Sequence, residues 1–271
     1  MTGNLAQVIA LVSFGNDFLQ TSTLPSDFYP DNSTFQFCNS VKFVALKKSI
    51  LNLKIKEKTI ADNPYLWFEL LKNENCKKLA LYFQNSEQSK SFDHELAGLV
   101  GGGGNWFIEA IYHNHSDFWV NNWEVSNNKA IEKKIWSVKY GATLLNHKTI
   151  NNTYQLHIVW EELKMALNEI ADFAFKNTTT NWGETFENAA KNLSSQTPEN
   201  NFYHKDFIIA KNYTLLARQI IYSAGLAWVF GGMGTWNDMC FNNDEINNLY
   251  NKLSEKLYNC INKSIIAVCN S

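Results

Sequence analysis

Short apolar runs and alternating apolar and polar positions fill the first 150 residues of the chain. Residues 8–14 form a continuous apolar run, which is typical of a buried strand. Apolar and polar residues alternate over 51–56, as they do in a strand with one solvent-exposed face. The same patterns, together with many aromatic and β-branched residues, predict further strands at 34–46, 65–71, 77–84, 105–112, 117–125 and 135–145. Strand after strand at short spacing, with a hairpin between 65–71 and 77–84, favours an antiparallel sheet.

The spacing of apolar residues becomes helical after about residue 153. Residues 161–175 carry apolar side chains on one face, and 182–193 repeat that pattern over a shorter length. A last helix is predicted from an N-cap at Asp244, with apolar residues three and four apart as far as Val268.

These patterns together predict an α+β protein. We expect an antiparallel, strand-rich region at 1–150 packed with a helical region at 151–271, in one compact unit. The stripe on the last helix is typical of packing against the chain's own core, and it also offers a homodimer contact through 244–268.

The most apolar long segment lies between residues 212 and 240. Apolar residues follow helical spacing from Thr214, and Gly231 and Gly232 are expected to end the helix. Arg218 and Gln219 interrupt the run, which therefore falls short of the roughly 20 apolar residues of a membrane span. We expect a buried core helix and no membrane partner.

Composition and charge restrict the class of protein. Hydrophobic residues make up 45% of the chain and charged residues 18%, which is typical of a globular protein. The net charge is −2 and no long lysine tract occurs, so duplex nucleic acid is not expected as a partner. The five cysteines include no CxxC motif, and the N-terminal run lacks the positive charge of a signal peptide. These features favour a cytoplasmic protein with free thiols and no cofactor or metal.

Asparagine makes up about one residue in eight, and 23 of the 24 basic residues are lysine. Both residues have AT-rich codons, so the composition indicates a bacterial or phage source. Arg218, the one arginine, stands out because its planar fork binds a carboxylate or phosphate through two bonds. Two readings remain open for it: a structural pair with a buried carboxylate, or contact with a ligand or partner.

A first candidate site combines Glu109, His113 and His115. Residues four apart in a strand share a face, which places Glu109 and His113 together. A His-x-His pair near a carboxylate suits acid–base catalysis or a metal-assisted reaction. No other part of the chain completes a metal-ligand pattern, and a polar hairpin end is the plainer interpretation.

A second candidate site combines two glycine clusters that share the form Gly-Gly-x-Gly-x-Trp. The first precedes a predicted strand and follows a predicted short helix or turn at 93–100, whereas the second follows the central helix. Their backbone N–H groups and aromatic rings would line one pocket if the clusters meet in space, with members Gly102, Gly103, Trp106, Gly232, Trp236 and Asp238. Neither cluster matches a P-loop or a dinucleotide fingerprint, and tight turns anchored by tryptophan are the alternative.

The aromatic content, with 9 Trp, 11 Tyr and 18 Phe, suits contact with another macromolecule. No motif for a catalytic nucleophile, zinc protease or kinase occurs. We therefore predict a macromolecule-binding protein with a protein partner, of a bacterial or phage defence or immunity type. The alternatives are a metal- or acid–base-dependent hydrolase, in which Glu109, His113 and His115 act on an anionic substrate held by Arg218, and a small-ligand sensor with a glycine- and tryptophan-lined pocket.

Overall fold

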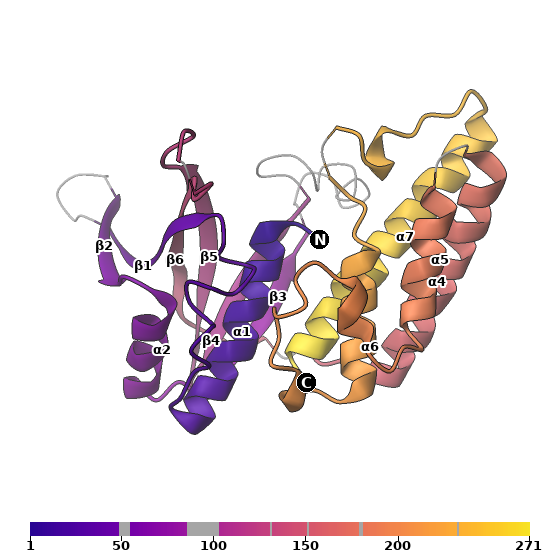
Figure 1. Cartoon of the computed structure of the whole chain (residues 1–271). Coiled ribbons are helices and arrows are strands. Elements are labelled where there is room, and N and C mark those ends of the chain that lie inside the picture. Colours follow the sequence, from indigo (N-terminus) through magenta and orange to yellow (C-terminus); the bar gives the residue numbers. More distant parts are fainter. Residues whose placement is uncertain (49–54, 86–102, 131, 151, 179–180, 232) are drawn as a thin grey trace.

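The chain folds around one six-stranded mixed sheet and a set of helices that lie mostly in its C-terminal half, as a computed structural model shows (Figure 1). The structure describes residues 1–48, 55–85, 103–130, 132–150, 152–178, 181–231 and 233–271. The predicted α+β class is confirmed. The strand predicted at 51–56 and the short helix or turn predicted at 93–100 lie wholly or mostly outside the described residues.

The sheet has the strand order β2-β1-β6-β5-β4-β3. Its strands are β1 (Cys38–Lys48), β2 (Ile55–Ala61), β3 (Lys78–Gln84), β4 (Asn105–Ile111), β5 (Ser116–Val125) and β6 (Trp136–His147). Four of its pairings are antiparallel, but β1 and β6 run parallel, with Val41 opposite Val138. The expectation of a wholly antiparallel sheet is wrong at this pair. A parallel pair needs a crossover connection, and the chain between β1 and β6 supplies it.

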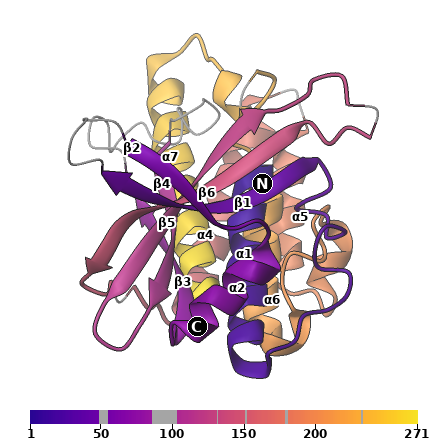
Figure 2. The ribbon, with the colours of Figure 1, turned by 90° about the vertical axis from the view of Figure 1, so that its left-hand side faces the viewer.

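The apolar run at 8–14 belongs to a helix, α1 (Gly3–Thr21), and the predicted strand there is wrong. Every residue from Leu5 to Gly15 is buried. A helix that is buried on all sides carries no polar face, so its sequence cannot be told from that of a buried strand by periodicity. Figures 1 and 2 show why it is buried, because α1 lies between the sheet and the C-terminal helices.

The predicted strand at 65–71 is also a helix, α2 (Pro64–Asn73). Asn63 caps it, because its side chain accepts a hydrogen bond from the backbone N–H of Leu66 at 2.9 Å. Pro64 then occupies the first helical position, where its fixed φ suits a helix and its missing N–H has no partner to lose. This start signal outweighs the β propensity of the aromatic residues that follow.

The C-terminal half contains α4 (Leu156–Asn177), α5 (Trp182–Asn192), α6 (Leu215–Leu226) and α7 (Asp244–Cys269), with short 3-10 helices η1 (Pro198–Asn201), η2 (Ala210–Asn212) and η3 (Trp236–Asp238). The central helix α6 ends at Leu226, so the expected end at Gly231 is five residues too late. The N-cap of α7 is Asn243, one residue before the expected Asp244, because its side chain accepts bonds from the N–H groups of Glu245 and Ile246. Within the described chain, no helix is long and apolar enough to span a membrane.

Two asparagine side chains cover the outer edge of the sheet, at strand β3. The Asn16 amide binds both main-chain groups of Leu79, at 2.9 and 2.7 Å. Asn270, which caps α7, binds both main-chain groups of Leu81 in the same way, at 3.0 and 2.7 Å. Each amide thus replaces part of a neighbouring strand, and β3 presents these groups to no other chain.

Candidate functional site: a groove between α4 and α7

Helices α4 and α7 lie side by side in opposite directions. Lys263 pairs with Glu162 and Lys256 pairs with Glu169, each at 2.6 Å. Seven residues forward along α4 therefore correspond to seven residues backward along α7. Two ion pairs, two turns apart, bridge the helices over this length.

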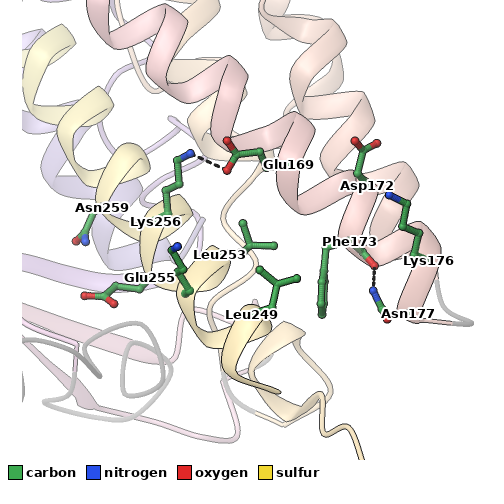
Figure 3. Close-up of a pocket in the computed structure, with 11 residues that line it drawn as sticks. Glu169, Asp172, Phe173, Lys176, Asn177, Leu249, Leu253, Glu255, Lys256 and Asn259 are labelled. Atoms are coloured by element: carbon green, nitrogen blue, oxygen red, sulfur yellow. Dashed lines mark hydrogen bonds and ion pairs between the residues drawn. The ribbon is translucent and has the colours of Figure 1, made fainter. Parts of the chain in front are cut away.

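Around the Glu169–Lys256 pair and toward the N-terminus of α7, the two helices border a groove of about 760 Å³ (Figure 3). It lies between the C-terminal half of α4 and the N-terminal half of α7. The residues that line it are Glu169, Asp172, Phe173, Lys176, Asn177, Leu249, Lys252, Leu253, Glu255, Lys256 and Asn259.

The floor of the groove is apolar. Phe173 is 4% exposed and Leu253 is 9% exposed, whereas Leu249 at the open end is 46% exposed. In Figure 3 these three side chains point into the space between the helices. The ring of Phe173 is supported from beneath by Phe241, at a centroid distance of 5.5 Å, and by Trp236 at 6.4 Å. The floor is therefore a fixed surface backed by the core.

The rim of the groove is charged and open to solvent. Near one end the Glu169–Lys256 pair bridges the two helices, with side chains 41% and 38% exposed. Toward the other end lie Asp172, Lys176 and Lys252, and none of these three forms an ion pair with another described residue. An apolar floor with a half-exposed charged rim has the composition of a protein interface, in which an apolar core is surrounded by polar residues.

The structure does not bring together the three residues of the first predicted site, Glu109, His113 and His115. Glu109 is 1% exposed, and its carboxylate accepts a bond from the backbone N–H of Ile150 at 2.9 Å. Burial raises the pKa of Glu109 above its ordinary value. His113 is exposed in the turn, while His115 stacks on Tyr112 with ring centroids 4.6 Å apart. Among the described residues, no three His, Cys, Asp or Glu side chains are grouped to hold a metal ion.

The two glycine clusters approach the same residue of α7, but their predicted ligand-binding side chains diverge. Gly102 and Gly232 lie outside the described residues. The carbonyl oxygen of Gly103 accepts a hydrogen bond from the Tyr258 hydroxyl, and the Tyr258 ring lies 5.2 Å from the ring of Phe230, just before the second cluster. Trp106 packs instead against Phe83, with centroids 4.8 Å apart.

Trp236 and Asp238, from the second cluster, have structural contacts. Trp236 is 0% exposed, and its indole N–H donates to the Ser254 hydroxyl at 2.8 Å. Asp238 accepts bonds from the backbone N–H groups of Gly234 and Thr235, and so caps η3. Trp236 therefore reaches a candidate site only indirectly, as the support beneath Phe173.

Arg218 forms a pair with Glu199 of η1, at 3.4 Å, with side chains 22% and 25% exposed. One of the two readings of the sequence was a structural pair with a buried carboxylate, whereas the carboxylate found here is partly exposed. The Arg218 Nε and Glu199 Oε2 atoms have no hydrogen-bond partner among the residues that the structure describes.

A cluster that the sequence does not reveal joins Ser33, His204 and Asp206. The Ser33 hydroxyl lies 2.9 Å from His204 Nδ1 and donates to Asp206, which also accepts the Ser33 backbone N–H at 2.8 Å. Burial, with a smaller effect of the nearby N-terminal amine, lowers the pKa of His204 to about 4. In a hydrolytic triad the imidazole accepts the serine proton, but here the hydroxyl is directed at the carboxylate. The cluster therefore clamps the loop before β1 to the segment after η1. No local spacing signals it, because 171 residues separate Ser33 from His204.

Comparison of the chain with protein families, with curated proteins and with solved structures gives no match.

Proposed function

We propose that this protein binds another protein by taking a segment of it into the groove between α4 and α7. The observation that carries the proposal is the exposed side chain of Leu249, 46% accessible, beside the apolar floor of an open hollow. Large apolar side chains gathered in a hollow and rimmed by polar groups mark sites where proteins meet.

The exposure of the lining argues for a macromolecule over a small ligand. Small-molecule sites bury about 70–90% of the ligand surface within a largely enclosed cavity. The groove instead has rim side chains about 40% exposed at Glu169 and Lys256. A segment of a partner protein can cover such an open surface, because the rest of the partner shields the rim.

A bacterial or phage setting is part of the proposal. It is supported by the asparagine- and lysine-rich composition. The five cysteines are free thiols, which supports a reducing compartment such as the cytoplasm. A defence or immunity role is the function class that we propose for a binding protein of this kind.

Affinity purification from the source cells tests the binding function. Leu249→Glu places a charge over the floor and should remove the partner, whereas Met165→Glu, at a 54% exposed apolar residue of α4 outside the groove, should retain it. Recovery of the same partner with both variants would place the binding surface elsewhere. Recovery of no stoichiometric partner with the wild-type protein would remove the proposal.

A second copy of the chain is the competing occupant. The half of α7 from Leu257 to Cys269 is largely buried within its own chain, so a homodimer contact through 244–268 would fall on the N-terminal half of this range. Sedimentation equilibrium of wild type and Leu249→Glu distinguishes the two cases, because only a homodimer through the groove would dissociate on substitution in the absence of any partner.

A further inference from the structure

We infer that the outer edge of strand β2 binds an acidic, extended segment of a different protein, which adds to the sheet as a further strand. This surface lies at the end of the molecule away from the groove between α4 and α7, and the inference does not depend on that groove (Figure 1). It is carried by the unpaired main chain of β2, by the contrast with the opposite edge of the sheet and by the charge of the two strands β1 and β2.

The main chain of β2 is paired on one side. β2 ends the sheet, and its neighbour in the strand order is β1. In an antiparallel pair every second residue turns its N–H and C=O groups away from the partner strand. Outside β1, no main-chain group of another described residue bonds to the main chain of Ile55–Ala61, and Glu57, Lys58 and Thr59 are exposed. The edge therefore offers the row of donors and acceptors with which an extended peptide pairs.

The opposite edge of the sheet is closed to such pairing. At β3 the side chains of Asn16 and Asn270 occupy the main-chain groups of Leu79 and Leu81. A side chain that covers an edge in this way blocks the addition of another strand. Strand addition to this sheet is therefore directed to β2.

Lysines dominate the two strands at the open edge. The sequences of β1 and β2 contain five lysines and one carboxylate, that of Glu57. The register places Lys47 opposite Lys56. Glu57 pairs with Lys139 of β6 at 3.0 Å, whereas the exposed Lys58 forms no ion pair with another described residue. The edge thus has an excess of positive charge, although the net charge of the whole chain is −2.

This charge selects a different, acidic protein over a second copy of the chain. Two copies that continued the sheet about a two-fold axis would bring their lysine-rich edges together, and like charges on facing strands are destabilising. Lysine at an edge also opposes pairing with an apolar strand. An added strand with Asp or Glu at alternate positions instead places an opposite charge beside Lys58.

The unpaired main chain favours a peptide over nucleic acid as the acidic partner. A peptide continues the ladder of N–H and C=O groups, and a nucleic acid has no equivalent groups in its backbone. β2 has seven residues, which span about 23 Å at about 3.3 Å per residue. A bound strand of about seven residues therefore matches the edge.

Selection from a displayed library of random nine-residue peptides tests the inference without knowledge of the natural partner. We expect the wild-type protein to enrich peptides with Asp or Glu at alternate positions and β-branched residues between them. These peptides should bind Lys58→Glu at least about fivefold more weakly, because the substitution replaces an attractive pair with a repulsive one. They should bind two control variants as well as wild type: Lys129→Glu, at an exposed lysine between β5 and β6, and Leu249→Glu in the groove.

N-methylation of the selected peptide separates main-chain pairing from attraction between charges. Methyl groups on alternate amide nitrogens block one edge of an extended peptide and leave its charge unchanged. Two such peptides, methylated at the two alternate sets of residues, should differ, with binding lost in one and retained in the other. Equal binding of both methylated peptides and the parent peptide would overturn strand addition.

The remaining outcomes would also overturn the inference, and they leave the groove to be judged separately. Enriched peptides that depend on Leu249 and not on Lys58 would assign binding to the groove, and the absence of any enriched peptide would remove the edge as a binding surface. Tighter binding of a single-stranded oligonucleotide than of any selected peptide would assign the lysines to nucleic acid. A wild-type dimer that the selected peptide dissociates would assign the edge to a second copy.

Discussion

The ring of Trp236 meets the ring of Phe173 edge-on, at a centroid distance of 6.4 Å and an interplanar angle of 82°. Trp236 is fully buried, whereas Phe173 forms the floor of the groove. A tryptophan that the sequence marks as a candidate ligand contact therefore acts from beneath the site. Its contribution is to the stability and shape of the floor.

Truncation of Trp236 tests this role. Trp236→Ala removes a fully buried indole and should lower the free energy of unfolding by about 3–5 kcal/mol. Trp236→Phe keeps most of the ring but leaves the Ser254 hydroxyl without the indole N–H, and should cost about 1–3 kcal/mol. Urea unfolding measures both values. An Ala variant as stable as wild type would contradict the buried position of this residue.

The asparagine at the edge of the sheet provides a second prediction. Asn270→Ala removes the bonds to both main-chain groups of Leu81 and leaves them buried without partners. We expect a loss of about 2 kcal/mol in the free energy of unfolding, and an increased tendency to aggregate through the uncovered edge of β3. Asn248→Ala, at an exposed position of the same helix, is the matched control and should change neither property.

The clamp at His204 predicts a loss of stability in acid. Its folded pKa is about 4, below the ordinary 6.5, so the unfolded chain binds the proton first. The stability associated with neutral His204 is therefore complete above pH 6.5 and is lost as the pH falls to about 4. A shift of this size corresponds to about 3 kcal/mol.

Unfolding measured between pH 7.5 and 4.5 checks this prediction. The stability of His204→Asn should depend less steeply on pH than that of wild type, while His157→Asn, at an exposed histidine, should follow wild type. Equal slopes for all three proteins would show that His204 is not held in its neutral form.

The buried carboxylate of Glu109 predicts the opposite dependence on pH. Burial raises its pKa, so the folded protein holds this proton more tightly than the unfolded chain, and Glu109 costs stability as the pH rises above its ordinary value. Glu109→Gln retains an oxygen to accept the Ile150 N–H and carries no charge. We expect this variant to be at least as stable as wild type at pH 7 in urea unfolding. A loss of more than about 1 kcal/mol would mean that the charge itself is needed.

The sequence predicts the fold class. It also predicts most of the helices and strands that have one buried and one solvent-exposed face. It fails at α1 because the helix is buried on all sides, and at α2 because the aromatic residues suggest a strand while Asn63 and Pro64 start a helix. The parallel pair of β1 and β6 depends on contacts between segments about 100 residues apart, for which no local pattern exists.

The groove follows only in part from the sequence. The apolar stripe of α7 is visible in the sequence and includes Leu249 and Leu253, whereas the stripe read for α4 does not include Phe173. The hollow arises because the two helices are antiparallel and held by ion pairs between residues 87 and 101 positions apart. That register is a tertiary property, and no spacing within either helix contains it.

Site-specific photo-crosslinking tests the central claim most directly. A benzophenone amino acid in place of Leu249 would lie over the groove floor, and the same amino acid in place of Met165 would lie on α4 outside the groove. The account predicts that position 249 crosslinks to one partner protein and that position 165 does not. Identical crosslinks from both positions, or none from position 249 in a complex that is shown to form, would contradict it.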